Sequence, residues 1–174
     1  MKELPAIPQA HPLPEPVTVW RICSRRHAES AFSGEGARRF GGRWNFPGAA
    51  MAYASDSLSL AALEILVQAD WQDLPEELVS VCAEVPPQLA AIRLGVQDLP
   101  GNWRSYPAKA SLRELGSRWL RQNLSALLIV PSAVIPQQDN YLLNPTHPEF
   151  SKICQRTARD FVLDSRLFAD CGAD

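Results

Sequence analysis

The sequence predicts a single domain of the α+β class. With 174 residues, the chain is long enough to form one domain with a buried core. Its apolar fraction of 46% and charged fraction of 21% are those of an ordinary globular protein. Stretches with strand character outnumber those with helical periodicity, and the two kinds follow one another in irregular order. A doubly wound sheet needs regular alternation of strands and helices, so this order favours the α+β class.

The N-terminal segment differs from the rest of the chain. Residues 1–16 contain five prolines and no periodic apolar pattern. Proline removes backbone donors and favours extended structure, so we expect a proline-rich arm that is either flexible or draped over the surface. The remaining residues, 17–174, are expected to form the domain itself.

The first half of the domain contains the clearest element of the sequence. A strand is predicted over 17–23, where apolar and polar residues alternate. Residues 33–48 hold five of the nine glycines and predict a long loop. A short buried strand over 50–55 then leads into a helix over 57–70, which has helical apolar spacing and is preceded by a Ser-Asp-Ser run suited to N-capping.

The second half continues the mixed pattern. A strand over 78–85 is stopped by two prolines, and a helix with a basic outer face is predicted over 111–123. A buried strand follows over 126–134. A polar loop over 136–150 and a terminal strand over 159–168 complete the prediction.

The charge balance argues against a nucleic-acid-binding protein. The net charge is −2 and the pI is near 5.9, whereas phosphate neutralisation usually requires a basic excess. Basic residues gather only locally, in a group that could hold a small anionic ligand: Arg25, Arg26, Arg38, Arg39 and Arg43.

Cysteine and histidine spacing predicts no metal site. The four cysteines form no CxxC pair, and the histidines offer no zinc spacing, so a reduced intracellular setting is expected. No N-terminal apolar run indicates a signal peptide, and no stretch approaches the ~18 apolar residues of a membrane span. We therefore expect a cytoplasmic protein without membrane contact.

Glu64 is the first candidate functional residue because of its apolar surroundings. On the predicted helix its neighbours are Leu60, Ala61, Val67 and Gln68, three of them apolar. Burial of a carboxylate costs free energy unless a partner or a ligand compensates. Glu64 is therefore either a structural carboxylate paired with an arginine, or a functional one that binds ribose or stabilises a developing sugar cation.

Arg43, Arg21 and Tyr53 are further candidates, and for each of them the pattern alone favours a purely structural role. Adjacent glycines before Arg43 let the backbone approach a ligand that the guanidinium could bind, although a tight turn with a solvated arginine gives the same pattern. Arg21 faces away from its apolar strand neighbours and could point to solvent. Tyr53 could be a core residue with a satisfied hydroxyl. No G-x-G-x-x-G or Walker pattern follows a strand here, which disfavours a Rossmann or P-loop site.

Ser132 and Asn140 come from the later part of the chain. Ser132 ends a buried strand, where side chains often face a cleft, but no G-x-S-x-G elbow surrounds it and no histidine is placed to act as its base. Asn140 falls in the predicted polar loop and could serve only the backbone of a turn.

These residues, in this order, resemble the RES-domain family, the toxin half of RES–Xre toxin–antitoxin pairs, named after an Arg, a Glu and a Ser. The matching segments span residues 17 to about 168: WRI, GGRWN followed by PG, YAS, LAALEIL, IVPSAV and NPTHPEF. The resemblance implies an ADP-ribosyltransferase-like fold, with a compact β core around an NAD cleft and flanking helices.

The resemblance also implies an enzyme that degrades NAD+ by cleaving the nicotinamide–ribose bond. Cleavage would use water, or inorganic phosphate as a co-substrate, and no metal. The resemblance implies that Arg21 and Arg43 bind the phosphates and that Tyr53 stacks beside the nicotinamide. It implies that Glu64 binds the ribose and stabilises the cationic transition state. Ser132 would position the substrate, and Asn140 would lie on the cleft rim.

Two alternatives remain open. One is a protein ADP-ribosyltransferase toxin that uses the same cleft, since local sequence does not reveal the acceptor. The other is a non-catalytic domain that binds an antitoxin, against which the intact Arg21, Glu64 and Ser132 argue. The resemblance implies an Xre-like antitoxin that covers the cleft and carries any DNA contact, and family members self-associate, so a homodimer within the complex is an option.

Overall fold

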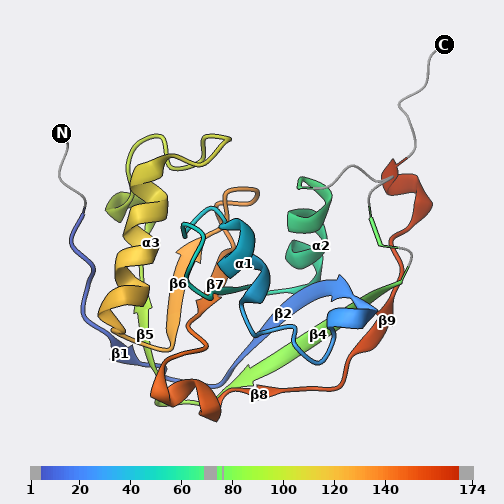
Figure 1. The fold of residues 1–174 in the computed structure, drawn as a ribbon, viewed down its shortest axis with the longest axis horizontal. Helices are drawn as coiled ribbons and strands as arrows, with labels where there is room; N and C mark the ends of the chain where they lie inside the picture. The colour runs from blue at the N-terminus through green and yellow to red at the C-terminus, as the bar shows by residue number, and fades with distance from the viewer. Residues whose placement is uncertain (1–4, 69–73, 76, 169–174) are drawn as a thin grey trace.

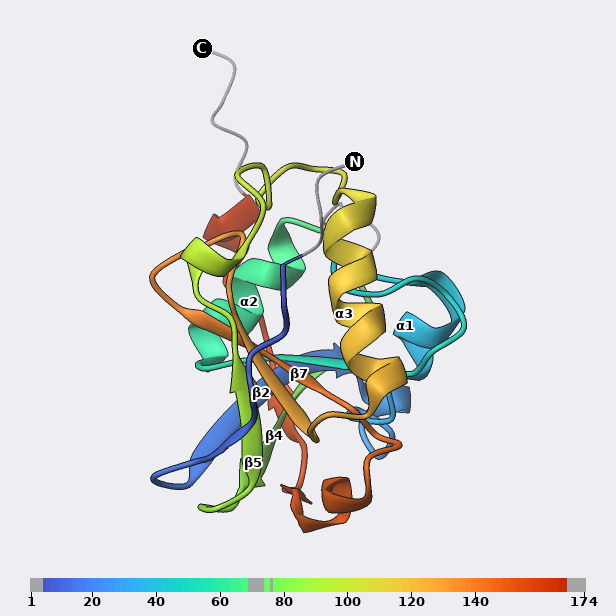
Figure 2. The same ribbon diagram turned by 90° about the vertical axis from the view of Figure 1, so that its left-hand side faces the viewer.

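A single curled sheet forms the centre of the molecule (Figures 1 and 2). The computed structural model describes residues 5–68, 74–75 and 77–168. In these residues the strand order is β1-β5-β6-β7-β3-β2-β4-β8, and β9 also pairs with β4. All pairings are antiparallel except that of β5 with β6. The strands are β1 (His11–Pro12), β2 (Val17–Ser24), β3 (Ala52–Ser55), β4 (Leu78–Val85), β5 (Ala90–Arg93), β6 (Leu127–Pro131), β7 (Asp139–Leu143), β8 (Cys154–Gln155) and β9 (Arg159–Phe161).

Three α-helices accompany the sheet in the described part of the chain. They are α1 (Glu35–Phe40), α2 (Leu58–Leu66) and α3 (Ala110–Gln122). Figure 1 shows α3 over the β5–β6 side and α2 beside β2. Short 3-10 turns occupy Arg25–His27, Val96–Asp98, Pro148–Lys152 and Ser165–Phe168.

Three apolar clusters hold these elements together. The largest lies inside the curl and joins residues of β2 and β4 to residues of β5, β6 and β7. A second packs α3, through Leu112, Leu115 and Trp119, onto β5, β6 and β7. A third seats α2 on β2 and β4. The prediction of an α+β fold with a compact β core is confirmed.

The strongest patterns gave the most accurate predictions. β4 has the predicted bounds, and all eight of its residues pair with the eight of β2. Helix α2 begins where the capping run predicts, because the Ser57 side chain accepts a hydrogen bond from the Leu60 amide. It ends at Leu66, earlier than the predicted 57–70, and residues 69–70 lie outside the described residues.

The predicted polar loop over 136–150 is wrong. Its centre, Asp139–Leu143, is strand β7, which lies between β3 and β6 inside the sheet. Tyr141, Leu142 and Leu143 are buried. Polar residues and prolines on both sides of this short apolar run obscured the strand signal.

Two further predictions need correction. The glycine-rich segment over 33–48 is not all loop, because it contains helix α1. The helix starts after Gly34, whose backbone is in the left-handed region (φ 73). Glu35 forms ion pairs with Arg38 and Arg39, one turn further along the helix, and these pairs stabilise it. The terminal strand over 159–168 is only three residues long and is followed by a 3-10 turn. Strand β5 had no sequence signal strong enough to predict it.

The described part of the proline-rich arm lies along the sheet edge. β1 pairs with β5, the Leu13 amide donates to the Leu89 carbonyl, and the Leu13 side chain is buried. The Arg118 side chain donates to the Pro5 carbonyl. The arm thereby covers the otherwise open edge of β5. No helix in the described residues is long and apolar enough to cross a membrane.

Candidate active site

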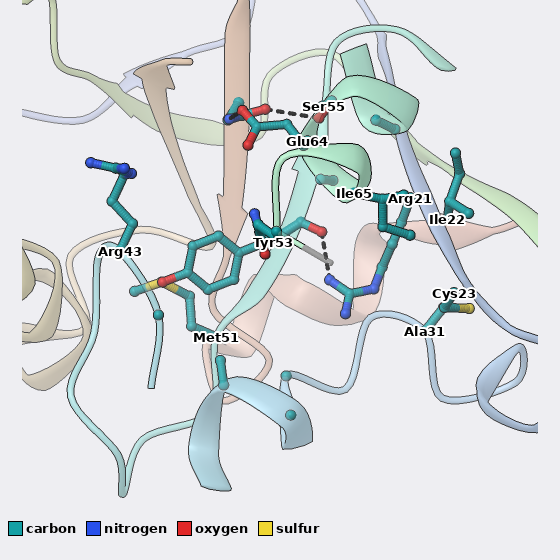
Figure 3. A pocket seen from close by; sticks show the side chains of 18 of the residues that line it. Arg21, Ile22, Cys23, Ala31, Arg43, Met51, Tyr53, Ser55, Glu64 and Ile65 are labelled. Carbon is teal, nitrogen blue, oxygen red and sulfur yellow. Dashed lines mark hydrogen bonds between the residues drawn. The ribbon is translucent and has the colours of Figure 1, made fainter. Parts of the chain in front are cut away.

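One cavity collects most of the candidate residues. Its volume is about 510 Å³, and its wall includes Arg21, Arg43, Tyr53, Glu64 and Asn140. These side chains come from β2, the glycine-rich segment, β3, α2 and β7. Figure 3 shows Glu64, Arg43, Tyr53 and Arg21 around this space. Residues that the sequence separates by more than a hundred positions thus share one site.

Glu64 is held through a single carboxylate oxygen. Its Oε1 accepts hydrogen bonds from Ser132 Oγ at 2.7 Å and from Asn140 Nδ2 at 2.5 Å. Asn140 is oriented in turn by Ser55, whose hydroxyl donates to the amide oxygen at 2.8 Å. Among the described residues no hydrogen bond reaches the second oxygen, Oε2. One oxygen is therefore anchored, and the other is left for a ligand.

Ser132 lies behind Glu64 rather than on the cavity wall. The residue is fully buried. Its hydroxyl donates to Glu64 and accepts from the amides of Val134 and Ile135, each at 3.0 Å. The sequence-based role was to position the substrate, whereas the structure gives this hydroxyl the carboxylate as its partner.

Arg21 brings a half-buried cation to the cavity wall. Its Nη1 donates to the Tyr53 carbonyl at 2.7 Å, which Figure 3 marks. Its Nε is buried and has no hydrogen-bond partner in the described part of the chain. Burial lowers the pKa of this guanidinium, although an arginine stays charged at neutral pH. An anion in the cavity would compensate the charge through Nη2, which makes no hydrogen bond in the described residues and is not among the fully buried atoms.

Tyr53 uses its hydroxyl for structure and leaves its ring to the cavity. The hydroxyl donates to Asn45 Oδ1 at 2.7 Å and accepts from the Trp44 amide at 3.0 Å. Burial raises the pKa of this phenol. The backbone of Gly42 passes so close that an added Cβ would lie 2.5 Å from the phenol oxygen. Gly42 is thus required by a close approach.

Asn45 fixes the same segment from within. It is fully buried, and its Nδ2 donates to the carbonyls of Ala37, Phe46 and Ala49. This network shapes the glycine-rich segment on which Arg43 stands.

Arg43 faces Glu64 across the cavity and braces a loop. Its Nη1 donates to the carbonyls of Trp103 and Ser105 at 3.0 and 3.2 Å. Burial lowers the pKa of Arg43, while the charge of Glu64 acts in the opposite direction. The remaining guanidinium nitrogens have no such bond in the described residues, so Arg43 can hold the loop and still bind an anion.

Comparison with known proteins identifies the family. The chain matches the RES domain over residues 18–164. It is 35% identical over 150 residues to "Toxin Res" of Photorhabdus laumondii, a match that covers 86% of this chain and 96% of that protein. The chain belongs to the RES-domain family. The resemblance drawn from its motifs is confirmed.

Other relatives and one solved structure agree with this assignment. The RES-domain chain is 38% identical to "Toxin Res" of Yersinia enterocolitica, over 86% of this chain and 98% of that one. It is also 38% identical to the "Prs ADP-ribosylating toxin" of a Sphingobium species, over 85% and 94%. The toxin–antitoxin complex MbcT–MbcA of M. tuberculosis contains a chain of the same fold, with a TM-score of 0.72 at 20% identity and 87% coverage of both chains. The chain is a RES-domain toxin with the fold of this toxin–antitoxin chain.

The arginine group proposed from the sequence does not form one anion site. Arg25 pairs with Glu77 and Asp160 on the surface, and Arg38 and Arg39 pair with Glu35. Of the group, Arg39 and Arg43 lie on the cavity wall, and only the latter faces Glu64. Spacing in the sequence did not reveal these local pairings.

Sequence reasoning also missed residues that build the RES-domain site. Ser55 was considered only as a helix cap, and Asn45 was not considered. Ser55 lies in a YAS strand end that pairs directly with Asn140, a signal that needed the correct placement of β7. In the described residues no group of three or more His, Cys, Asp or Glu side chains is arranged to hold a metal ion.

Proposed function

We propose that this RES-domain toxin cleaves the bond between nicotinamide and ribose in NAD+. The proposal rests on one observation: the wall of a single cavity carries an anchored carboxylate, Glu64, and two partly buried arginines, Arg21 and Arg43. An anion-binding wall and a carboxylate suit a substrate that has both phosphates and a reacting sugar.

The chemistry follows from the charge that develops on the ribose. When the C1′–N bond breaks, its electron pair leaves with neutral nicotinamide, and the ribose becomes cationic like an oxocarbenium ion. A carboxylate held beside it stabilises this charge, and it does so more strongly when hydrogen bonds have already fixed its orientation. The neutral leaving group needs no general acid, so the reaction requires no histidine beside Glu64.

The arginines serve binding and orientation. Arg21 and Arg43 would hold the pyrophosphate, because guanidinium groups match phosphate geometry. Tyr53 would offer its ring to the nicotinamide. Asn140 would touch Glu64 rather than the dinucleotide, and Ser132 would support the carboxylate from behind.

The test is nicotinamide release from NAD+ by the purified chain, freed from any partner, with and without inorganic phosphate. Release that depends on phosphate indicates phosphorolysis, in which a phosphate oxygen bonds to C1′. Release without phosphate indicates hydrolysis. Absence of turnover under both conditions, without transfer of ADP-ribose to protein, would favour a non-catalytic antitoxin-binding domain.

Glu64→Gln is the decisive variant. Gln keeps an oxygen to accept the Ser132 and Asn140 bonds but removes the charge, so turnover should fall at least ~100-fold with the fold intact. Glu114→Gln is the matched control, because Glu114 pairs with Arg121 on the surface of α3. If Glu64→Gln kept full activity, the role of this carboxylate would be wrong.

A protein ADP-ribosyltransferase is the second candidate. One relative, 38% identical, is named an ADP-ribosylating toxin. The same bond breaks, but a protein side chain attacks C1′ in place of water or phosphate. Transfer of label from adenine-labelled NAD+ to a protein of a cell lysate, lost in Glu64→Gln, would distinguish this activity from NAD+ degradation.

We also propose an antitoxin partner that closes the cavity. The structural neighbour was solved as a toxin–antitoxin complex. An Xre-like antitoxin would bring any DNA contact, since this chain is acidic, and a toxin dimer within the complex would double the binding sites. Co-expression followed by size-exclusion chromatography would establish the partner and the stoichiometry, and NAD+ turnover should vanish in the complex.

A further inference from the structure

We propose that the part of the cavity bounded by Cys23, His27, Ser30 and Ala31 binds the adenylate half of the substrate. These four residues lie on the wall of the same cavity as Glu64. The inference rests on the NAD+ substrate proposed above and assigns the two halves of that dinucleotide to two ends of one cavity.

The sheet register separates the two ends. Trp20 of β2 pairs with Ser55 of β3, which pairs with Asn140 of β7, and this row marks the end that holds Glu64. Cys23 lies three residues further along β2, which corresponds to ~10 Å at ~3.3 Å per residue. Figure 3 shows Cys23 on the side of Arg21 that faces away from Arg43.

Arg21 lies between these ends. It is one residue beyond the Trp20 row, with Nη1 fixed on the Tyr53 carbonyl and Nε buried without a partner in the described residues. In a dinucleotide the pyrophosphate joins the two nucleosides. With the nicotinamide ribose at Glu64 and the pyrophosphate between Arg43 and Arg21, the adenosine continues past Arg21 toward Cys23.

The residues at this end suit a purine nucleoside. His27 and Ser30 are exposed, on the short segment that follows β2, and offer an aromatic face and a hydroxyl. Ala31 is buried and Cys23 half-buried, and burial raises the pKa of the Cys23 thiol, so the floor is uncharged. Bases stack on imidazole rings and tolerate small apolar surfaces beneath them.

The 100–109 loop is the rival location for the base. Tyr106 is 88% exposed on this loop, which Arg43 and Arg104 hold in place through the carbonyls of Trp103, Ser105 and Ala133. It is an aromatic surface near the Glu64 end, where adenine would have to fold back over the pyrophosphate.

Calorimetric titration of the full chain with ADP-ribose and with ribose 5-phosphate separates the two locations. Neither compound carries nicotinamide, so neither is turned over by glycosidic cleavage. The wild-type chain should bind ADP-ribose more tightly, and the ratio of the two affinities measures the adenylate contribution. His27→Ala should reduce this ratio about fivefold or more, the loss expected for one stacked base, and Ser30→Trp should reduce it by filling the space.

Matched controls exist elsewhere on the surface. His11 is an exposed histidine of β1, and Ser151 donates to the carbonyl three residues before it just as Ser30 does. His11→Ala and Ser151→Trp should leave the ratio unchanged. Three results would each overturn the inference. The first is an unchanged affinity ratio in both His27→Ala and Ser30→Trp, and the second is the absence of ADP-ribose binding. The third is a reduced ratio that appears only in Tyr106→Ala. If the wild-type chain cleaves NAD+ but the affinity ratio is unchanged in the two variants, only the adenylate subsite is contradicted. If the ratio falls in the variants but the wild-type chain does not cleave NAD+, only the proposed reaction is contradicted.

Discussion

The two walls of the cavity differ in how many of their polar groups have hydrogen-bond partners. On the α2 side, Glu64 Oε1 is bonded to Ser132 and Asn140, and each of those groups has further partners. On the β2 side, the buried Nε of Arg21 has no partner in the described residues. The carboxylate is therefore oriented before any ligand binds and keeps Oε2 for it, whereas the guanidinium retains a buried donor without a partner.

This difference separates orientation from binding. A carboxylate that must stabilise a short-lived cation gains from being fixed in advance, because no reorganisation is needed at the moment of reaction. A cation that must bind an anion gains from having free donors, although its burial without a partner costs stability. We therefore expect substitutions on the two walls to affect activity and stability in different proportions.

Arg21→Gln should give the largest separation of the two quantities. We expect kcat/KM for NAD+ to fall ~10- to 100-fold, the loss of one or two charged hydrogen bonds, mainly through KM. The free energy of unfolding should change little, because removal of a guanidinium with a buried, unpaired Nε offsets loss of the bond from Nη1 to the Tyr53 carbonyl. Steady-state kinetics and urea denaturation of the same preparations measure both. A parallel loss of activity and stability would show that Arg21 is a structural residue.

Ser132→Ala should affect the acceptor wall in the opposite manner. The variant removes the 2.7 Å bond to Glu64 and leaves the half-buried amides of Val134 and Ile135 without their acceptor. Unpaired buried polar groups destabilise a protein by ~1–3 kcal/mol, so unfolding should occur at lower urea concentration. Turnover should fall chiefly in kcat, since the carboxylate loses its fixed orientation. Unchanged stability with a raised KM would instead return Ser132 to the substrate-positioning role expected from the sequence.

The sequence predicted the two walls unequally well. Glu64 was identified from its apolar helical neighbours, a local signal that survives in the fold because α2 really does pack on β2. Its bond to Asn140 was missed, since that residue was placed in a loop rather than in a strand within the sheet. Residue spacing along the chain does not reveal which strands pair with each other. Here the pairing of β3 with β7 places Asn140 where it can bind Glu64.

The glycine-rich segment shows a similar limit. Five glycines in sixteen residues predicted a loop. Their individual roles differ, because Gly34 adopts a left-handed conformation, Gly42 lies against the Tyr53 hydroxyl and Gly36 meets nothing within 4 Å. Composition cannot distinguish a glycine required by a tertiary approach from one that is merely tolerated in a helix.

Gly42→Ala and Gly36→Ala turn that distinction into a paired test of the wall beneath Tyr53. The added Cβ at Gly42 would lie 2.5 Å from the Tyr53 hydroxyl oxygen, so the segment must shift, at a cost of ~1–3 kcal/mol. At Gly36, inside α1, the same change should stabilise by ~0.5–1 kcal/mol through helix propensity. Thermal unfolding followed by circular dichroism compares the pair. Equal effects would mean that the approach of Gly42 to Tyr53 does not constrain the segment.

The smallest effect should come from the exposed ion group on α1, which contrasts with the buried network around Glu64. Hydrogen bonds from Arg38 and Arg39 lower the pKa of Glu35 to about 2. Because the folded value is depressed, the ionised carboxylate contributes stability above its ordinary pKa near 4.5 and loses it as the pH falls through about 2. Glu35→Gln should therefore shift the melting temperature slightly at pH 7, less in high salt, and the difference should shrink as the pH falls below 4.5. If the difference in melting temperature persisted unchanged at pH 2 and in 1 M salt, Glu35 would act through packing rather than charge. The Glu35 ion group would then stabilise the fold in the same way as the buried network around Glu64, despite its exposure.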